Sequence, residues 1–119
     1  MSAKRLLECS FLIPNRRDRN LSDGKPHLPA AWKWLRAQLY QFGGGTCAID
    51  LYEGWYEDRD TGKPVKDLSR KYFVALPRQE VDRLRSVLQE ACIVFQQKCI
   101  YLSVAGYVEF VEGPRHETT

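Results

Sequence analysis

The sequence predicts an α+β domain of the ferredoxin-like type, in which two helices cover one face of a four-stranded antiparallel sheet. Two observations lead to this prediction. Two β-like runs in the middle of the chain are joined by turn residues, and a helix-like segment lies before and after them. The resulting order is β-α-β-β-α-β, and right-handed crossovers place both helices on the same face of the sheet.

The length of 119 residues suits one domain, expected over residues 1–112, followed by a flexible polar tail at 113–119. Hydrophobic residues make up 44% of the chain, as in globular proteins, and the net charge is only +3. The densest positive cluster is Arg16, Arg17 and Arg19 in a loop. This long loop is either functional or mobile. The basic excess over residues 1–41 as a whole is interpreted as solvated surface, because nucleic-acid-binding domains usually show denser basic clustering.

No apolar run near the N-terminus is long enough for a signal peptide, and no stretch of about 18 apolar residues occurs. We therefore expect a soluble, cytoplasmic protein. The four cysteines form no Cys-x-x-Cys pair, and each lies in an apolar run, so we expect reduced core residues: Cys9, Cys47, Cys92 and Cys99.

The first half of the chain holds a strand, a helix and a second strand. The first strand runs from Arg5 to Pro14, where proline ends it. The helix begins at Pro29, follows the i, i+3/i+4 pattern to Phe42, and stops at Gly43. The second strand is expected over 47–56, with a bulge at Gly54. The apolar side chains expected to face the helices are Leu7, Cys9, Phe11, Ile13, Cys47, Ile49 and Leu51.

The second half begins with a polar reversal over 57–69 and a return strand over 70–76, which together make a long arm. The second helix is expected over 79–97, with one apolar face. The last strand is expected over 99–111, with a bulge at Gly106 and with Ile100, Leu102 and Val104 facing the helices.

The sheet face without helices carries small, acidic and aromatic side chains, and we weigh three interpretations of it. The first is self-association as a homodimer, since exposed sheet suits packing on a copy of itself. The second, less favoured, is binding of single-stranded nucleic acid, which the acidic side chains oppose. The residues expected on this face are Glu8, Ser10, Leu12, Ala48, Asp50, Tyr52, Tyr101, Ser103 and Ala105.

The third interpretation is a small-molecule site at the junction of the Gly43–Thr46 turn and the arm. Backbone N–H groups beside glycines, an aromatic wall and a few polar groups are the usual parts of a ligand pocket. The candidate ligand-binding residues are Gly44, Gly45, Thr46, Trp55, Tyr56, Asp67, Ser69 and Arg70. An enzyme with its site in the same cleft is the alternative.

Catalysis and metal binding find little support in the sequence. His27 lies at a helix entrance and is interpreted as a surface or capping residue, and His116 lies in the polar tail. No carboxylate stands at ligand spacing from either histidine, so we assign no catalytic residue, no metal and no cofactor. The first interpretation of function is a small binding or interaction module, homodimeric, with a possible small-molecule ligand.

Several short motifs resemble a family of small uncharacterised bacterial proteins with a ferredoxin-like fold. They are Phe42-Gly43-Gly44-Gly45-Thr46, Gly54-Trp55, Gly62-Lys63, Asp67-x-Ser69 and Phe95-x-Gln97. The resemblance extends from about Phe11 to Val111. It implies the same fold, and the family brings no established activity.

Overall fold

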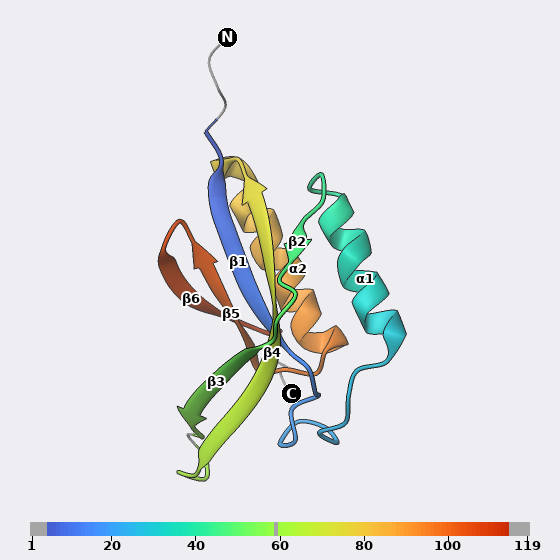
Figure 1. Ribbon diagram of the computed structural model, residues 1–119, viewed down its shortest axis with the longest axis vertical. Helices are drawn as coiled ribbons and strands as arrows, with labels where there is room; N and C mark the ends of the chain where they lie inside the picture. Colours follow the sequence, from blue (N-terminus) through green and yellow to red (C-terminus); the bar gives the residue numbers. More distant parts are fainter. Residues whose placement is uncertain (1–4, 59, 115–119) are drawn as a thin grey trace, which may run out of the picture.

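The computed structural model describes residues 5–58 and 60–114, which form an antiparallel sheet and two helices (Figure 1). The last five residues of the expected tail lie outside the described residues. The elements are β1 (Leu7–Pro14), α1 (Pro29–Tyr40), β2 (Thr46–Cys47), β3 (Tyr52–Glu57), β4 (Pro64–Leu76), the 3-10 turn η1 (Arg78–Glu80), α2 (Val81–Val94), β5 (Cys99–Val104) and β6 (Tyr107–Glu112).

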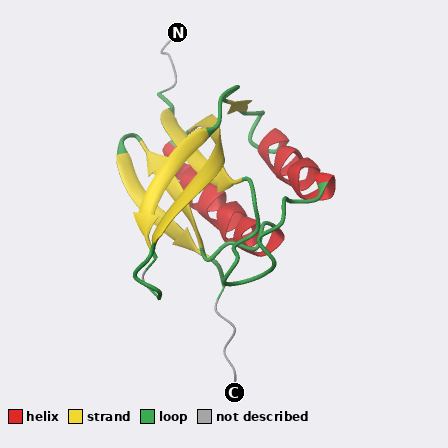
Figure 2. Cartoon of the chain, turned by 60° about the horizontal axis from the view of Figure 1, so that its bottom comes forward, coloured by secondary structure: helices red, strands yellow, loops and turns green. Residues whose placement is uncertain are grey.

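The sheet has six strands rather than the expected four, in the order β2-β4-β1-β5-β6, and β3 pairs with the other half of β4. Every pairing is antiparallel. Figure 2 shows α2 running along one face of the sheet, with α1 beside it. The α+β class with two helices is therefore confirmed. Among the described residues, no helix is long and apolar enough to cross a membrane.

The core lies between the central strand β1 and helix α2. Cys9, Phe11 and Ile13 alternate along β1 and are fully buried, as the alternation predicts. Helix α2 contributes Leu84, Leu88 and the residues that follow at the same spacing. The remaining buried apolar side chains are Leu35, Leu39, Val74, Leu76, Val81, Ala91, Cys92, Phe95, Ile100, Leu102 and Val111.

The prediction of one strand over 47–56 is wrong, because the chain leaves the sheet between β2 and β3. Cys47 pairs with Tyr72 and Tyr52 pairs with Ser69, so four residues of one strand stand opposite two of β4. The extra residues loop outward. Ile49 is therefore 99% exposed instead of buried, and Leu51 and Cys47 are exposed too.

Two bulges expected at glycines are also wrong. Gly54 continues the ladder without interruption and pairs directly with Asp67. Gly106 ends a strand instead of distorting it: Ala105 and Gly106 have φ values of 50° and 89°, the two left-handed residues of a tight hairpin turn. The expected last strand therefore divides into β5 and β6.

The arm is the hairpin of β3 with residues 64–68 of β4, and Figure 1 shows it extending below the rest of the sheet. Strand β4 starts at Pro64, so part of the predicted polar reversal is strand. The turn at the tip is closed by the Asp58 N–H, which donates to the Lys63 carbonyl at 2.9 Å. The prediction of a long arm is confirmed.

Candidate functional site

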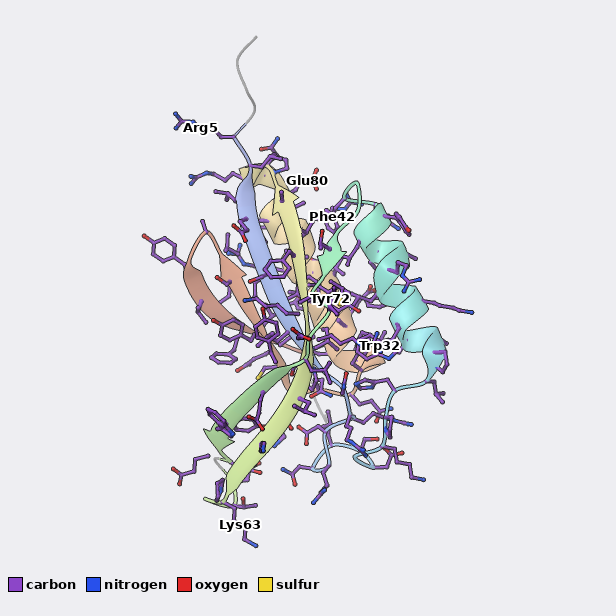
Figure 3. The ribbon with its side chains drawn as sticks, in the orientation of Figure 1. Arg5, Trp32, Phe42, Lys63, Tyr72 and Glu80 are labelled. Carbon is purple, nitrogen blue, oxygen red and sulfur yellow. The ribbon has the colours of Figure 1, made fainter. Side chains whose placement is uncertain are left out.

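The predicted ligand-binding residues fall into two groups at opposite halves of β4. Thr46 pairs with Phe73, whereas Tyr56 pairs with Val65, eight positions earlier in the same strand. At ~3.3 Å per residue the two pairs are separated by roughly 26 Å. Figure 3 shows this separation, with Phe42 and Lys63 labelled toward opposite ends of the sheet. The glycine turn and the arm tip do not form one pocket.

The glycine turn has a structural explanation. Gly43 and Gly44 have φ values of 94° and 112°, and the Gly44 N–H donates to the Leu39 carbonyl, which ends α1 as expected. A Cβ on Gly45 would lie 3.1 Å from the Phe73 carbonyl oxygen, so the close approach to β4 favours glycine. With Thr46, these glycines line an open groove of about 760 Å³ that also holds Glu8.

The arm carries a more specific arrangement on one face. The Tyr56 hydroxyl donates to Asp67 Oδ2 at 2.9 Å. In the β3–β4 register, Tyr52, Gly54 and Tyr56 share a face with Asp67 and Ser69, since side chains alternate along each strand. Gly54, opposite Asp67, has open space where a side chain would be. We call this set, a carboxylate between two tyrosines, the tyrosine–aspartate niche.

Burial and neighbouring carboxylates control the protonation of Tyr56 in the niche. Partial burial raises the pKa of the Tyr56 hydroxyl well above its usual range, and the hydrogen bond to Asp67 raises it further. The charges of Asp67, Asp18 and Asp58 act in the same direction. Tyr56 therefore stays protonated as a donor. Asp67 accepts this bond through its Oδ2.

Ser69 and Lys71 complete the surroundings of the niche. Ser69 is buried and lies directly across the ladder from Tyr52. The Lys71 ammonium lies over the rings of Tyr52 at 4.9 Å and Phe73 at 5.2 Å. Tyr52 and Lys71 were not among the predicted site residues. Their signal was the alternation that places both on the same sheet face as Asp67.

Trp55 and Arg70 lie on the opposite face of the arm and of β4, so the structure does not bring them into the niche. Trp55 is 74% exposed and lies opposite Lys66. The Arg70 guanidinium stacks on the Trp32 ring at 3.8 Å from its centroid. Figure 3 labels Trp32 on α1, away from the arm tip.

His27 differs from the expected surface or capping residue. It is half-buried, its Nε2 lies 2.7 Å from the Pro14 carbonyl oxygen, and its ring packs edge-on against Trp32 and Phe95. Burial lowers its pKa, and the charges of Arg17 and Arg70 lower it further, although the Pro14 contact opposes them. Among residues 5–58 and 60–114, no group of three or more His, Cys, Asp or Glu is arranged to hold a metal ion.

The fold and the niche define a class, a small α+β protein with an acidic, aromatic site on an antiparallel sheet. Two solved structures share this fold. A phage SAM lyase in complex with S-methyl-5′-thioadenosine has a TM-score of 0.72 at 12% identity, covering 98% of this chain and 97% of that chain. A phage SAM lyase in the apo state has a TM-score of 0.62 at 14% identity, covering 98% and 100%. No family model and no curated protein matches the sequence.

These similarities correct the first interpretation of function. A binding or interaction module without catalysis was favoured, and an enzyme was the alternative. Both structural neighbours are enzymes, and one holds a small nucleoside ligand. The findings therefore favour the alternative over the module. At 12% and 14% identity they establish a shared fold, and the reaction of this chain is a matter for proposal.

Proposed function

We propose that this protein is an enzyme that binds S-adenosylmethionine and releases S-methyl-5′-thioadenosine, with the tyrosine–aspartate niche as the substrate-binding site. The fold supports this proposal because the similarity to the lyase covers nearly the whole of both chains. The observation that carries it is the hydrogen-bonded Tyr56–Asp67 pair, which presents a carboxylate beside the exposed rings of Tyr52 and Tyr56.

The chemistry of the substrate suits such a niche. S-adenosylmethionine carries a sulfonium cation, which is attracted both to a carboxylate and to the faces of aromatic rings. Asp67 offers an oxygen beside the gap left by Gly54, and Tyr52 and Tyr56 flank the same gap. The adenine ring has a flat apolar surface that stacks on a tyrosine.

A lyase breaks the bond between sulfur and the adjoining carbon of the amino acid fragment without adding water. Both bond electrons stay on sulfur, which changes from a sulfonium to a neutral thioether. The carbon that loses sulfur must then form a new bond within the substrate. Either the carboxylate oxygen of the substrate attacks this carbon, or the neighbouring carbon loses a proton. In the second case Asp67 is placed to accept the proton. Tyr56 holds Asp67 in position in both cases.

The test is the formation of S-methyl-5′-thioadenosine from S-adenosylmethionine, measured by liquid chromatography and mass spectrometry against a sample without protein. We expect Asp67→Asn to lower the rate by about 100-fold and Tyr56→Phe by about tenfold. Asp50→Asn, an exposed carboxylate between β2 and β3, is the matched control and should keep the rate. No product above the blank, or equal rates for the two Asp→Asn variants, would overturn the proposal.

We also propose a ferredoxin-like description of the sheet. Strands β2 and β3 both pair with β4, so they share one strand position that is interrupted at 48–51. With that position counted once, the order around β1 matches the expected β-α-β-β-α-β arrangement, and β6 is an added edge strand.

Self-association through the sheet face away from the helices is a further proposal. This face carries Leu12, Phe73, Tyr101 and Phe110, of which Phe110 is 64% exposed and contacts the Tyr101 ring. Exposed apolar patches of this kind suit a symmetric interface, most often a two-fold dimer. Light scattering should give a mass above that of one chain, and Phe110→Asp should reduce it. A monomeric wild-type mass would refute the interface.

A further inference from the structure

Lys71 is a cation on the same face of the sheet as the tyrosine–aspartate niche. Side chains alternate along a strand, so the residues of β4 on this face are Val65, Asp67, Ser69, Lys71, Phe73 and Ala75. Lys71 is the basic member of this set. It follows Ser69 on this face, on the side of the niche that leads toward the body of the sheet.

The Lys71 side chain contacts the niche through Tyr52. Its ammonium lies 4.9 Å from the centre of the Tyr52 ring, and Tyr52 stands directly across the ladder from Ser69. The same ammonium lies 5.2 Å from the centre of the Phe73 ring. Aromatic faces attract a cation, and Lys71 as a whole is half-buried. Its charge is therefore held at a defined place beside Tyr52 instead of moving freely in solvent.

The Lys71 ammonium has no acidic partner among residues 5–58 and 60–114. No carboxylate of these residues lies within ion-pair distance of it, whereas Lys66 pairs with Glu53 and Lys98 pairs with Asp60. The faces of aromatic rings attract the charge but leave the N–H donors of an ammonium without a strong acceptor. A carboxylate of a bound molecule would supply that acceptor.

The spacing between Lys71 and the niche suits the amino-acid part of the proposed substrate. Neighbouring rows of side chains on one face are ~7 Å apart, and the row of Tyr52 and Ser69 lies next to the row of Gly54 and Asp67. In S-adenosylmethionine a chain of propyl length joins the sulfonium to the carboxylate. Such a chain, followed by an ion pair of ~3 Å, spans one row. A sulfonium beside Asp67 would therefore bring the carboxylate within reach of the Lys71 ammonium.

We propose that Lys71 binds the substrate carboxylate and makes the site selective for the intact amino-acid group of S-adenosylmethionine. This inference rests on the proposed function, because it uses the same niche. It also gives a reason for product release: S-methyl-5′-thioadenosine has no carboxylate, so its contact with Lys71 is lost when the bond to sulfur breaks.

The experiment compares two nucleosides that differ by one carboxylate, S-adenosylhomocysteine and S-adenosyl-3-thiopropylamine, with S-methyl-5′-thioadenosine as the reference ligand. Isothermal titration calorimetry measures their affinities, and none of them has a sulfonium to cleave. The wild-type chain should bind S-adenosylhomocysteine at least about tenfold more tightly than the amine. Lys71→Met should reduce this preference to less than about twofold and keep the affinity for S-methyl-5′-thioadenosine, whereas Lys71→Arg should retain most of the preference.

Lys66→Met is the matched control, because Lys66 lies on the opposite face of the same strand and should not affect the preference. Binding of S-methyl-5′-thioadenosine by the wild-type chain without a preference between the other two nucleosides would overturn the role of Lys71 alone. An unchanged preference in Lys71→Met would do the same. A wild-type chain that binds none of these nucleosides would overturn the proposed substrate site and, with it, the role of Lys71.

Discussion

The body of the sheet and the arm are built from the same strand, β4, but differ in almost every physical respect. In the body, β4 pairs with β1 over Ser69–Leu76 and packs on the core through Val74 and Leu76. In the arm it pairs with β3 alone, and every residue of β3 is exposed. The body is covered on one face by helices, whereas the arm is a single two-stranded layer.

This difference separates stability from function. Burial of apolar side chains supplies most of the folding free energy, so the body determines whether the chain folds. The arm is held by its ladder and by a few polar contacts, which leaves its side chains available to a ligand. Under the proposed function, substitutions in the niche should therefore change binding and catalysis with little effect on folding.

The largest difference in unfolding free energy between body and arm is expected when one aromatic residue in each is replaced by alanine. Phe11 is fully buried and stacks on Tyr72, so Phe11→Ala should lower the free energy of unfolding by about 3–5 kcal/mol. Trp55→Ala, in the arm, should lower it by less than about 1 kcal/mol. Urea denaturation followed by circular dichroism measures both values. Similar losses for the two variants would show that the arm shares in the core.

Within the body itself, the four cysteines should divide by burial, and their reactivity should show it. Cys9 and Cys92 are buried, and burial raises the pKa of the Cys92 thiol to about 11. Cys47 and Cys99 are exposed, contrary to the expectation of four core cysteines. At pH 8, a chromogenic disulfide reagent should modify the exposed pair at least about 100-fold faster than the buried pair. Four equal rates would contradict the assignment of Cys9 and Cys92 to a closed core.

Two glycines provide a matched pair with opposite surroundings. A Cβ on Gly113 would lie 2.9 Å from the Cβ of Cys92, so Gly113→Ala should cost about 1–3 kcal/mol. A Cβ on Gly54 meets nothing within 4 Å, so Gly54→Ala should leave stability unchanged or slightly raise it. Thermal unfolding distinguishes them. Gly54→Ala also narrows the gap over Asp67 and should therefore weaken binding of S-methyl-5′-thioadenosine under the proposed function. An affinity equal to that of the wild-type chain would contradict this prediction.

The contrast between buried and exposed segments also explains which parts of the fold can be predicted from the sequence. Buried segments carry a periodic signal, so the first strand and the apolar face of the second helix are found from alternation and from i, i+4 spacing. Breaks in strands carry no such signal. Ala105 takes a left-handed φ that its side chain does not favour, and the outward loop at 48–51 follows from the register with β4.

The candidate site was predicted in part for a related reason. Tyr56, Asp67 and Ser69 were identified because polar and aromatic residues gather in the arm. The glycine turn was grouped with them by closeness in sequence, but Thr46 and Tyr56 lie beside distant parts of β4. Only the pairing register reveals that separation, and a single sequence does not supply the register.

The smallest effect is expected at the contacts that tie the arm to the body. Asn20 Nδ2 donates to Asp58 Oδ2 at 2.9 Å, and the Lys98 ammonium pairs with Asp60 at 2.8 Å. Both pairs are exposed, so Asn20→Ala with Lys98→Ala should cost less than about 1 kcal/mol of global stability. Lys33→Ala, at an exposed position on α1, is the control.

Local opening should respond more than global unfolding, because these contacts hold only the tip of a single-layer hairpin. In the double variant the amide protons of β3 should exchange faster by a few-fold, while those of β1, which is paired on both sides, should not change. Equal acceleration in β1 and β3 would mean that the arm and the body open as one unit. In that case the niche would be as rigid as the core, and substrate would have to enter a site that is already formed.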